Sequence, residues 1–415
     1  MSRIAVVGSG IAGMGAAWLL SRRHEVVLFE ANDYLGGHTH THDIELQGKT
    51  YAVDSGFIVF NHAHYPLLTR MFTELGVASQ PTRMSFSVHD EANGLEYNAG
   101  SLRGLFAQPR NLVNPRFWRM LRDLFRFYRQ APSVLKQTAP GPTLGEYLES
   151  HGYSQAFRDD HIVPMASALW SSPANQILDF PMRHLVGFMA NHHMLQLAGR
   201  PEWRVVSGGS QSYVRALRRR WQVTERTSTP VHAIRRQGAA IVLRSSVGEE
   251  HFDQVVLACH ADDALNLLSD ASELEREVLG AISYGDNEAI LHTDVRVLPT
   301  RRKAWAAWNA HVSAQPGAPC SVSYWMNELQ SLDAPEQFIV TLNRSSDIDP
   351  ARILRRLHYR HPQQDHASVA AQSRKHEIQG VRGTWFAGAG WGFGFHEDGI
   401  RSGVEMARQL GVQWP

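Results

Sequence analysis

The 415-residue sequence is poor in cysteine and lysine and has almost no net charge. Its two cysteines, Cys259 and Cys320, have neither metal-ligand spacing nor the pattern of a disulfide framework, which is typical of a reducing cytoplasm. A net charge of +1 creates no overall field for nucleic acid, so no such partner is expected. No apolar run reaches the ~18 residues of a membrane-spanning helix, and the start lacks a signal-peptide pattern. The sequence predicts a cytoplasmic protein that could contact a membrane only peripherally.

The first twenty residues contain a glycine-rich turn between an apolar run and a helix-like segment. Residues 4–7 show no alternation, as expected for a strand of a parallel sheet that is covered on both faces. The turn reads G-x-G-x-x-G. In dinucleotide-binding folds these glycines permit the tight turn, the approach of the backbone to a pyrophosphate and the close packing of helix on strand, while the helix N-terminus faces the anion. The cofactor-binding residues predicted here are Gly8, Gly10, Ile11, Ala12 and Gly13.

A second apolar stretch, residues 25–30, ends in an acidic residue. Glu30 follows Gly13 by seventeen residues, near the spacing of the acid that binds a ribose hydroxyl. A carboxylate at this place favours an unphosphorylated ribose, hence FAD or NAD rather than NADP. A glycine pair, a polar hairpin and another glycine-bearing stretch come next, which nicotinamide-dependent dehydrogenases do not usually insert here. The residues concerned are Ala31, Gly36, Gly37, His38, Ser55, Gly56 and Phe57.

This arrangement resembles the flavin amine oxidase superfamily, which includes monoamine oxidases, protoporphyrinogen oxidase and phytoene desaturase. Its members carry E-A-x-x-x-x-G-G-R where this chain has E-A-N-D-Y-L-G-G-H, residues 30–38. The resemblance implies an α/β fold, with a Rossmann-like FAD-binding domain and an inserted substrate domain of mixed α+β structure. His38 replaces the arginine that would reach the FAD phosphates, which leaves the charge of that contact open.

The resemblance also assigns later segments to the cofactor. Residues 231–245 are predicted to form a hairpin, with Val231 where the superfamily's backbone contacts adenine. The stretch WFAGAGWGFGFHEDGIRSG, residues 385–403, is read as a last buried strand followed by a helix. The amides of the first helical turn would face the flavin N1–C2=O edge, where negative charge gathers on reduction. The cofactor residues predicted here are Gly388, Gly390, Asp398, Gly399 and Ile400.

We therefore expect an FAD-binding domain of residues 1–80, 205–262 and 380–415, and a substrate domain of residues 81–204 and 263–379. Further stretches resemble a bacterial subgroup of flavoproteins linked to cyclopropane, methyl-branched and furan fatty acids. They are VDSGFIVFNHAHYP, AILHTD, AAWNAH, VSYWMNELQ and GFGFHEDGIRSG. This implies an FAD-dependent desaturase or oxidase that acts on a C–C bond of a modified fatty acyl chain by hydride transfer to the flavin. O2 is the expected electron acceptor, because no second dinucleotide fingerprint occurs.

Two other functions stay open. One is a flavin amine oxidase, but residues 282–294, which would carry the lysine that such enzymes place near N5, contain none. Lys303 is the lysine that could still reach the site, although its basic neighbours indicate a solvated face. The other is a flavin-bound membrane accessory protein with little turnover.

The C-terminal stretch also supplies the predicted catalytic residues, which are Trp391, His396 and Glu397. Trp391, Phe393 and Phe395 are expected to line an apolar channel against the flavin, and His396 or Glu397 to act as a base. For the two acids, capping of the last helix is the alternative, and it is favoured for Asp398. His38, His40 and His42 alternate, so one strand face is expected to show all three. These histidines, and the pair His62 and His64, could ligate a metal. No acidic or cysteine ligand supports them, so no metal site is predicted.

Residues 101–136 form a basic aromatic segment with seven arginines, one lysine and a single acid, Asp123. At about 100° per residue, the arginines of residues 116–129 fall on one helical face and the aromatic and aliphatic residues fill the other. This pattern indicates either an interfacial helix on an anionic membrane surface or a helix that buries its apolar face in the core. A membrane contact would give direct access to a lipid or fatty acyl substrate.

Overall fold

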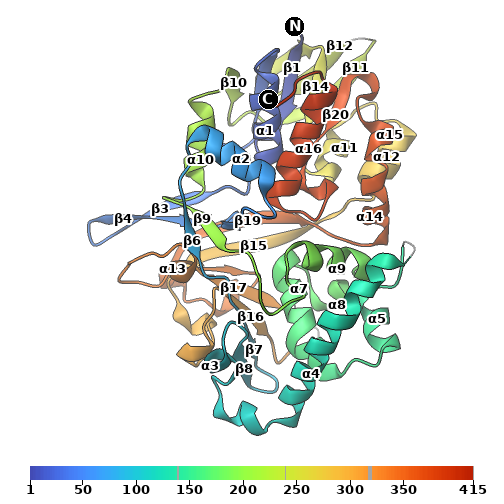
Figure 1. Cartoon of the computed structure of the whole chain (residues 1–415). Helices are drawn as coiled ribbons and strands as arrows, with labels where there is room; N and C mark the ends of the chain where they lie inside the picture. Colours follow the sequence, from blue (N-terminus) through green and yellow to red (C-terminus); the bar gives the residue numbers. More distant parts are fainter. Residues whose placement is uncertain (138–139, 239, 316–319, 415) are drawn as a thin grey trace.

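The computed structural model describes residues 1–137, 140–238, 240–315 and 320–414, and one half of it contains a five-stranded parallel sheet (Figure 1). The strand order is β10-β2-β1-β14-β20, and every neighbouring pair is parallel. The sheet joins segments from the start, middle and end of the chain, which confirms the predicted α/β class. Its strands are β1 (Arg3–Val7), β2 (Glu25–Phe29), β10 (Val223–Arg226), β14 (Gln254–Leu257) and β20 (Thr384–Phe386).

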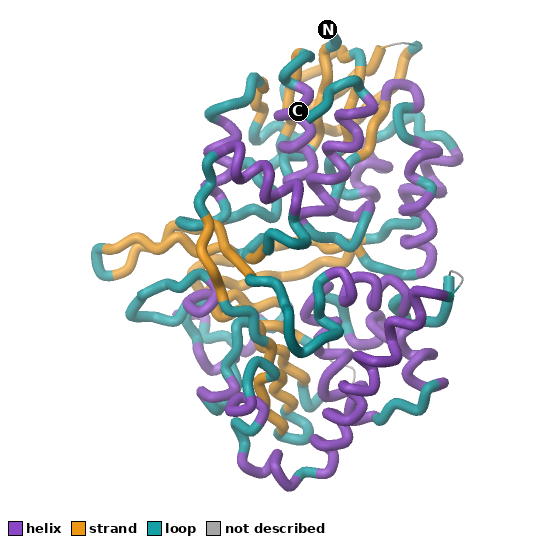
Figure 2. Tube along the Cα trace, in the orientation of Figure 1, coloured by secondary structure: helices purple, strands orange, loops and turns teal. Residues whose placement is uncertain are grey.

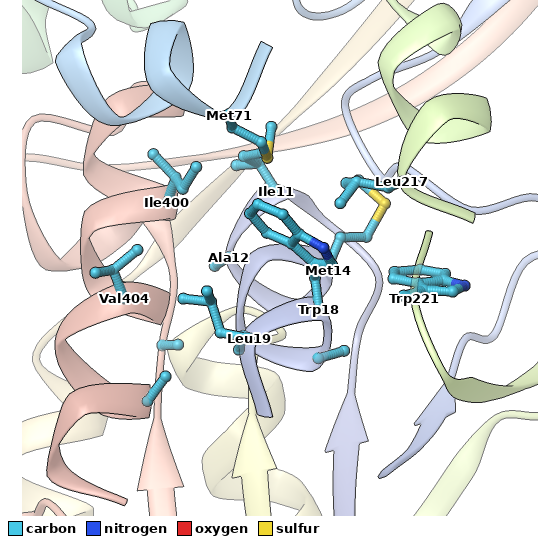
Figure 3. Packing of buried hydrophobic residues seen from close by; sticks show 14 of the residues in the cluster. Ile11, Ala12, Met14, Trp18, Leu19, Met71, Leu217, Trp221, Ile400 and Val404 are labelled. Carbon is cyan, nitrogen blue, oxygen red and sulfur yellow. The ribbon is translucent and has the colours of Figure 1, made fainter. Parts of the chain in front are cut away.

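Helices cover one face of this sheet, where alternate strand residues such as Val6 and Leu28 are buried. Figure 3 shows this cluster, in which Ile11 and Trp18 lie near Ile400 and Val404. The first and last helices approach closely, because a Cβ on Gly403 would lie only 2.6 Å from the carbonyl oxygen of Ala12. The helices are α1 (Ile11–Leu20), α2 (Pro66–Leu75), α10 (Gln211–Arg218) and α16 (His396–Gln409).

The other face carries the intervening strand residues, including Val7 and Phe29, and is covered by a small sheet and four short helices. The hairpin predicted over residues 231–245 is confirmed as the antiparallel pair of β11 and β12. The covering elements are β11 (Val231–Gln237), β12 (Ala240–Ser245), β13 (Gly248–Phe252), α11 (Ala261–Leu267), α12 (Glu273–Gly280), α14 (His366–Ser373) and α15 (Lys375–Ile378).

The second half is built on a seven-stranded sheet of order β19-β15-β18-β17-β16-β7-β8. Its pairs are antiparallel except for β16 and β7, which run parallel. The strands are β7 (Phe86–Asp90), β8 (Leu95–Asn98), β15 (Tyr284–His292), β16 (Trp308–Val312), β17 (Ser321–Trp325), β18 (Ile339–Leu342) and β19 (Ile353–Pro362). The exact boundaries of the two expected domains remain a prediction.

A helical lobe packs beside this sheet through α7, as Figure 2 shows. No helix among the described residues is long and apolar enough to cross a bilayer. The lobe contains α4 (Pro115–Gln130), α5 (Leu144–Ser150), α6 (Gln155–Phe157), α7 (Val163–Trp170), α8 (Ala174–Leu178) and α9 (Met182–Asn191). The remaining elements are β3 (Thr41–Leu46), β4 (Lys49–Asp54), β5 (Val59–Phe60), β6 (Ser79–Thr82), β9 (Trp203–Val206), α3 (Leu102–Leu105) and α13 (Met326–Leu329), besides short 3-10 and π turns.

Candidate functional site

The first glycine turn lies between β1 and α1, at the carboxyl edge of the parallel sheet. A Cβ on Gly13 would lie 1.9 Å from the carbonyl oxygen of Gly8, so the helix can approach the turn only because this residue is glycine. A Cβ on Gly10 would meet no atom within 4 Å, so the backbone there is open to a ligand. The side chains of Ile11 and Ala12 are buried in the core, so these residues can meet a cofactor only through their backbone.

The carboxylate of Glu30 lies beside this turn, at the end of β2. Its Oε2 accepts hydrogen bonds from the N–H and hydroxyl of Ser9 at 3.0 and 2.6 Å, and its Oε1 accepts from the N–H and amide of Asn32 at 2.9 and 3.0 Å. The N–H of Thr229 donates to the Glu30 carbonyl at 2.9 Å, which brings the start of β11 to the same place. The neighbouring predicted residues are Ala31, which is exposed, and Val231, which is half-buried. Their ribose and adenine contacts remain predictions.

The glycine pair after β2 meets the first glycine turn. A Cβ on Gly37 would lie 3.1 Å from the Cα of Gly10. A Cβ on Gly56 would lie 2.1 Å from the carbonyl oxygen of His38, to which the N–H of Phe57 donates at 2.7 Å. The two predicted glycine-bearing stretches therefore pack against each other, and glycine is needed for the contact.

The ring of His38 faces the seven-stranded sheet. It stacks on Tyr359 at 4.9 Å between centroids and lies 5.3 Å from the ring of His361. Burial is the main cause that lowers the pKa of His38 well below its usual value, so the ring is neutral. Its Nε2 atom is buried without a hydrogen-bond partner among the described residues. The site thus offers one unsatisfied polar nitrogen where the superfamily has an arginine.

The last helix, α16, begins at His396. Asp398 and Gly399, which are among the predicted cofactor residues, therefore lie in its first turn. The imidazole of His396 stacks on Phe57 at 3.7 Å, and its Nε2 lies 3.0 Å from the hydroxyl of Thr39. Burial lowers the pKa of His396 to about 3, so its ring is neutral across the physiological range. These contacts position the start of α16, and a role for His396 as a base remains a prediction.

The carboxylates of Glu397 and Asp398, both in α16, accept hydrogen bonds from N–H groups at the starts of helices. Oδ2 of Asp398 accepts from the N–H of Phe395 at 3.1 Å, as capping predicts. The two carboxylate oxygens of Glu397 accept from the N–H groups of Leu67 and Leu68, at 3.0 and 3.1 Å, in the first turn of α2. Glu397 therefore has a structural task that the sequence did not reveal, because its partners lie some 330 residues away.

The expected apolar channel of three aromatic residues is divided in the structure. Phe393 and Phe395 pack with the helical lobe, whereas Trp391 packs with the opposite cluster around β14 and α11. Between them lies Gly392, where a Cβ would be 2.7 Å from the Asp398 carboxylate, and Trp391 joins a different cluster from the other two rings. The prediction of one common wall was wrong in this respect.

Residues of the seven-stranded sheet that the sequence did not single out belong to the same region. The hydroxyl of Tyr359 lies 2.7 Å from Oγ of Ser55, and the hydroxyl of Tyr284 lies 2.4 Å from where a Cβ on Gly390 would be. Nδ2 of Asn287 lies 3.1 Å from Nδ1 of His361 and can donate to it. No local pattern could reveal these residues, since only the docking of β15 and β19 on the glycine turns brings them there.

The histidine patterns do not form shared ligand sets. His40 and His42 lie 4.1 Å apart between ring centroids, but His38 precedes β3 and faces β19. His62 reaches Thr69, whereas His64 packs against two histidines after α9. The expectation of one strand face with three histidines was therefore wrong. Among the described residues, His260, Asp262 and Asp263 each place a possible metal-ligand atom within 4.8 Å of the others, but Arg360 pairs with both acids.

The residues of this edge fit a dinucleotide cofactor. The backbone of Gly10 is open, and a buried nitrogen of His38 lacks a partner. The N-termini of α1 and α16 lie together, since a Cβ on Gly399 would be 2.7 Å from Cγ2 of Ile11. Two helix N-termini at one edge favour an anion or the electron-rich edge of a flavin. Gly388 also belongs to this edge, because its N–H donates to Ser402 of α16 at 3.1 Å.

Comparison with solved structures shows the same fold in several enzymes. A cyclohexylamine oxidase from Brevibacterium oxydans IH-35A has a TM-score of 0.70 and 15% identity, and the match covers 99% of both chains. A CLA-producing fatty acid isomerase from P. acnes has a TM-score of 0.68 and 16% identity, also over 99% of both chains. A reduced UDP-galactopyranose mutase has a TM-score of 0.70 and 16% identity, over 100% of this chain and 97% of the other.

No curated protein sequence matches the chain. The model of the family described as flavin-containing amine oxidoreductase, however, matches residues 11–319, which is well over half of the chain. This match begins at Ile11, the first residue of α1, and includes Gly13, the acid at the end of β2, the glycine pair that follows it and the hairpin of β11 and β12. The chain therefore belongs to the flavin-containing amine oxidoreductase family, and its cofactor is FAD.

Proposed function

We propose that this FAD-dependent oxidoreductase oxidises a C–C bond of a fatty acyl chain, most simply by desaturating a methyl-branched or otherwise modified chain. The observation that carries the proposal is the apolar aromatic surface directly before α16. Phe395 stacks on Phe188 of α9 at 4.6 Å, and Phe393 lies 5.6 Å from the same ring. Nε1 of Trp170 donates to the Phe393 carbonyl at 3.0 Å, which fixes the segment to the lobe.

Such a surface suits an acyl chain better than an amine. Each buried CH2 group contributes about 0.8 kcal/mol to binding, whereas an ammonium group would need a charged or polar partner. The two carboxylates that line the same cavity, Glu397 and Asp398, already accept hydrogen bonds from backbone N–H groups and from Arg401. The fold is shared with a fatty acid isomerase as well as with amine oxidases, so fold alone does not select the substrate.

The positions of the lysines also favour this proposal. β15, which would carry the lysine of an amine oxidase, has none. Lys303 is exposed, as its basic neighbours indicated. Nζ of Lys375 donates to Oγ of Ser402 at 2.9 Å, and its ammonium lies 5.5 Å from the ring centroid of Trp391, which packs with a different cluster from Phe393 and Phe395.

Desaturation removes a hydride and a proton from adjacent carbons, and bound FAD supplies the hydride acceptor. His192 is the residue that we expect to accept the proton. It lines a small cavity of about 20 Å³ together with Phe393 and Phe395. Its Nδ1 lies 3.0 Å from the carbonyl of Phe188 and so carries the hydrogen, which leaves Nε2 as an acceptor. Burial lowers the pKa of His192 to about 4, so the imidazole is neutral before the reaction.

Anaerobic mixing of the FAD-loaded protein with detergent-dispersed acyl substrates tests the proposal. Methyl-branched and cyclopropane fatty acids, free and in phospholipid, are expected to bleach the flavin band, and cyclohexylamine is not. His192→Phe should lower the rate of bleaching at least ~100-fold, which is the usual contribution of a general base. The matched control is His193→Phe, since this neighbour is exposed and does not line the cavity. Faster bleaching by the amine would show an amine oxidase, and no bleaching by any acyl compound would favour the accessory role.

A further inference from the structure

Exposed apolar side chains gather on one stretch of the surface, in α3, the turn after it and α4. Ten large apolar residues of the described chain are exposed, and five of them come from residues 102–125. Val113 is 81% exposed and Leu102 is 76% exposed, and exposed apolar side chains that gather on one surface mark an interaction site. We call this surface the arginine–apolar face. Its apolar members are Leu102, Leu112, Val113, Trp118 and Phe125.

The same face carries an excess of positive charge. The only acid of the segment, Asp123, is buried and pairs with Arg122 and Arg126, while Arg116 pairs with Asp160. The other arginines have no carboxylate partner among the described residues, and all of them are exposed. They are Arg103, Arg110, Arg119 and Arg129.

The folding of α4 does not require these exposed apolar groups. Its inward face already buries Phe117, Met120 and Phe127, in the same cluster as Trp170 and Phe188. The two alternatives that the sequence left open for this helix are therefore not exclusive, because one set of apolar residues fills the core and a second set faces outward.

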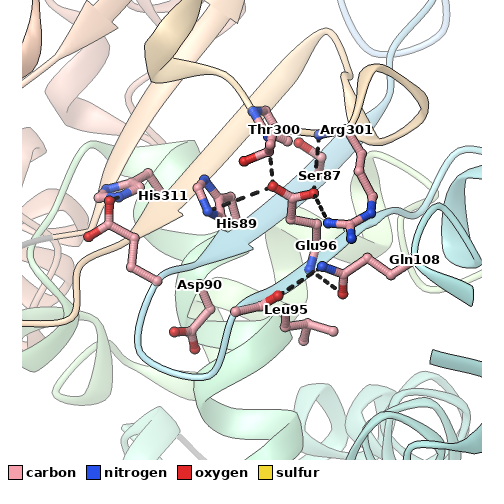
Figure 4. A network of polar contacts seen from close by, with 12 residues as sticks. Ser87, His89, Asp90, Leu95, Glu96, Gln108, Thr300, Arg301 and His311 are labelled. Carbon is pink, nitrogen blue, oxygen red and sulfur yellow. Dashed lines mark hydrogen bonds and ion pairs between the residues drawn. The ribbon is translucent and has the colours of Figure 1, made fainter. Parts of the chain in front are cut away.

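Buried polar contacts of Glu96 fix part of the arginine–apolar face. Figure 4 shows the buried carboxylate of Glu96, which accepts from the N–H groups of Thr300 and Arg301 at 2.7 and 3.2 Å. The N–H of Glu96 donates to Gln108 at 3.1 Å, and Asn111 donates to the carbonyl of Glu96 at 3.1 Å. The turn that carries Leu112 and Val113 is therefore fixed by buried polar contacts, so it presents its apolar side chains in a defined arrangement.

We propose that the arginine–apolar face binds the surface of an anionic lipid bilayer. Aromatic and aliphatic side chains would enter the headgroup boundary, and the arginines would pair with lipid phosphates and anionic headgroups. The face, which includes α3 and part of α4, lies at the end of the molecule opposite the five-stranded sheet (Figure 1). A second copy of the chain suits it less, because a two-fold contact would place the same unpaired arginines against one another. This inference does not depend on which bond the enzyme oxidises.

Vesicle flotation of the full-length, FAD-loaded protein tests the proposal. Vesicles of phosphatidylcholine with phosphatidylglycerol should bind the protein at low salt and release it at high salt, and phosphatidylcholine alone should bind it weakly. Arg119→Gln/Arg129→Gln should weaken binding about 25-fold, since each arginine near an anionic surface contributes about fivefold. The control Arg244→Gln/Arg276→Gln removes two exposed arginines elsewhere and should not change binding.

A second pair of variants tests the apolar part. Val113→Ser should weaken binding severalfold, whereas Val247→Ser, which changes another exposed valine on the turn between β12 and β13, should not. Absence of binding to anionic vesicles at low salt would overturn the proposal. So would a wild-type dimer in sedimentation velocity that Val113→Ser converts to a monomer, because the face would then join two copies. Flavin bleaching by detergent-dispersed acyl substrate, measured on the same samples, separates a failure of membrane binding from a failure of the proposed reaction.

Discussion

At the scale of single residues, the three glycines of the first turn have different physical roles. Gly8 and Gly13 are needed by the protein itself, since a Cβ on either would lie 2.9 Å or less from a backbone carbonyl oxygen. Gly10 has space around it, so the fold alone would tolerate a side chain there. Its requirement for glycine comes from the cofactor, whose pyrophosphate must approach the backbone.

This difference gives a prediction for two alanine variants. Gly13→Ala should lower the free energy of unfolding by several kcal/mol, because helix and turn must separate. Gly10→Ala should change it by less than about 1 kcal/mol in the cofactor-free protein and yet lose most of its affinity for FAD. Urea unfolding of the cofactor-free protein and titration with FAD measure the two quantities. Gly280→Ala is the control, since its Cβ would make only an ordinary contact at 3.7 Å; full FAD affinity in Gly10→Ala would contradict this assignment.

At the scale of elements, Glu397 joins the starts of two helices. It lies in the first turn of α16 and accepts hydrogen bonds from the first turn of α2 with both carboxylate oxygens. A carboxylate there satisfies N–H groups that a helix cannot satisfy by itself, and its charge is favourable near a helix N-terminus. Burial raises the pKa of Glu397, and the Leu67 and Leu68 amides counteract this effect.

We expect Glu397→Gln to lower the free energy of unfolding and to have little effect on the rate of flavin bleaching. The amide can accept one of the two hydrogen bonds but places an NH2 group against the other N–H donor, which costs about 1–3 kcal/mol. Urea unfolding and the rate of flavin bleaching should be measured on the same samples. Glu405→Gln, an exposed change on the same helix, is the control and should alter neither. Unchanged stability with a ~100-fold slower bleaching would instead identify Glu397 as the base.

At the scale of the whole molecule, the many histidines make folding sensitive to acid. Burial is the main cause that lowers the pKa of four well-buried histidines to about 4. They are His42, His161, His192 and His292. In the unfolded chain a histidine titrates near 6.5, so below that pH the unfolded state binds more protons than the folded state. The stability that comes from burying these histidines in their neutral form is therefore complete above pH 6.5 and is lost as the pH falls towards 4.

The lowered pKa values of these histidines predict that the protein unfolds in mild acid. Four such histidines remove up to about 5 kcal/mol per pH unit below 6.5, which is comparable with the total stability of many proteins. Burial raises the pKa of Asp54 to about 6, and that single carboxyl acts in the opposite direction. Urea unfolding followed by circular dichroism at pH 7.5, 6.5 and 5.5 should show a steep loss of stability at the lowest value. Equal unfolding midpoints at all three would refute the prediction.

The sequence by itself determined the cofactor edge, because its elements are local. The glycine turn, the acid after the second strand and the hairpin at residues 231–245 each lie within a short stretch, and backbone sterics or hydrogen bonding require their residue types. The spacing of residues in α4 likewise predicted its basic amphipathic pattern. It did not predict how the apolar residues divide between core and surface.

Only the tertiary structure decided which side chains share the site. The roles of Glu397, Tyr359 and His361 depend on partners about 300 residues away in the chain, and Trp391 and Phe395 pack with different clusters although they are close in sequence. Local periodicity contains no information on how two sheets dock, because docking is set by the combined shape of many buried side chains. The sequence therefore determined that the chain holds FAD, and the packing of its two halves decided what surrounds it.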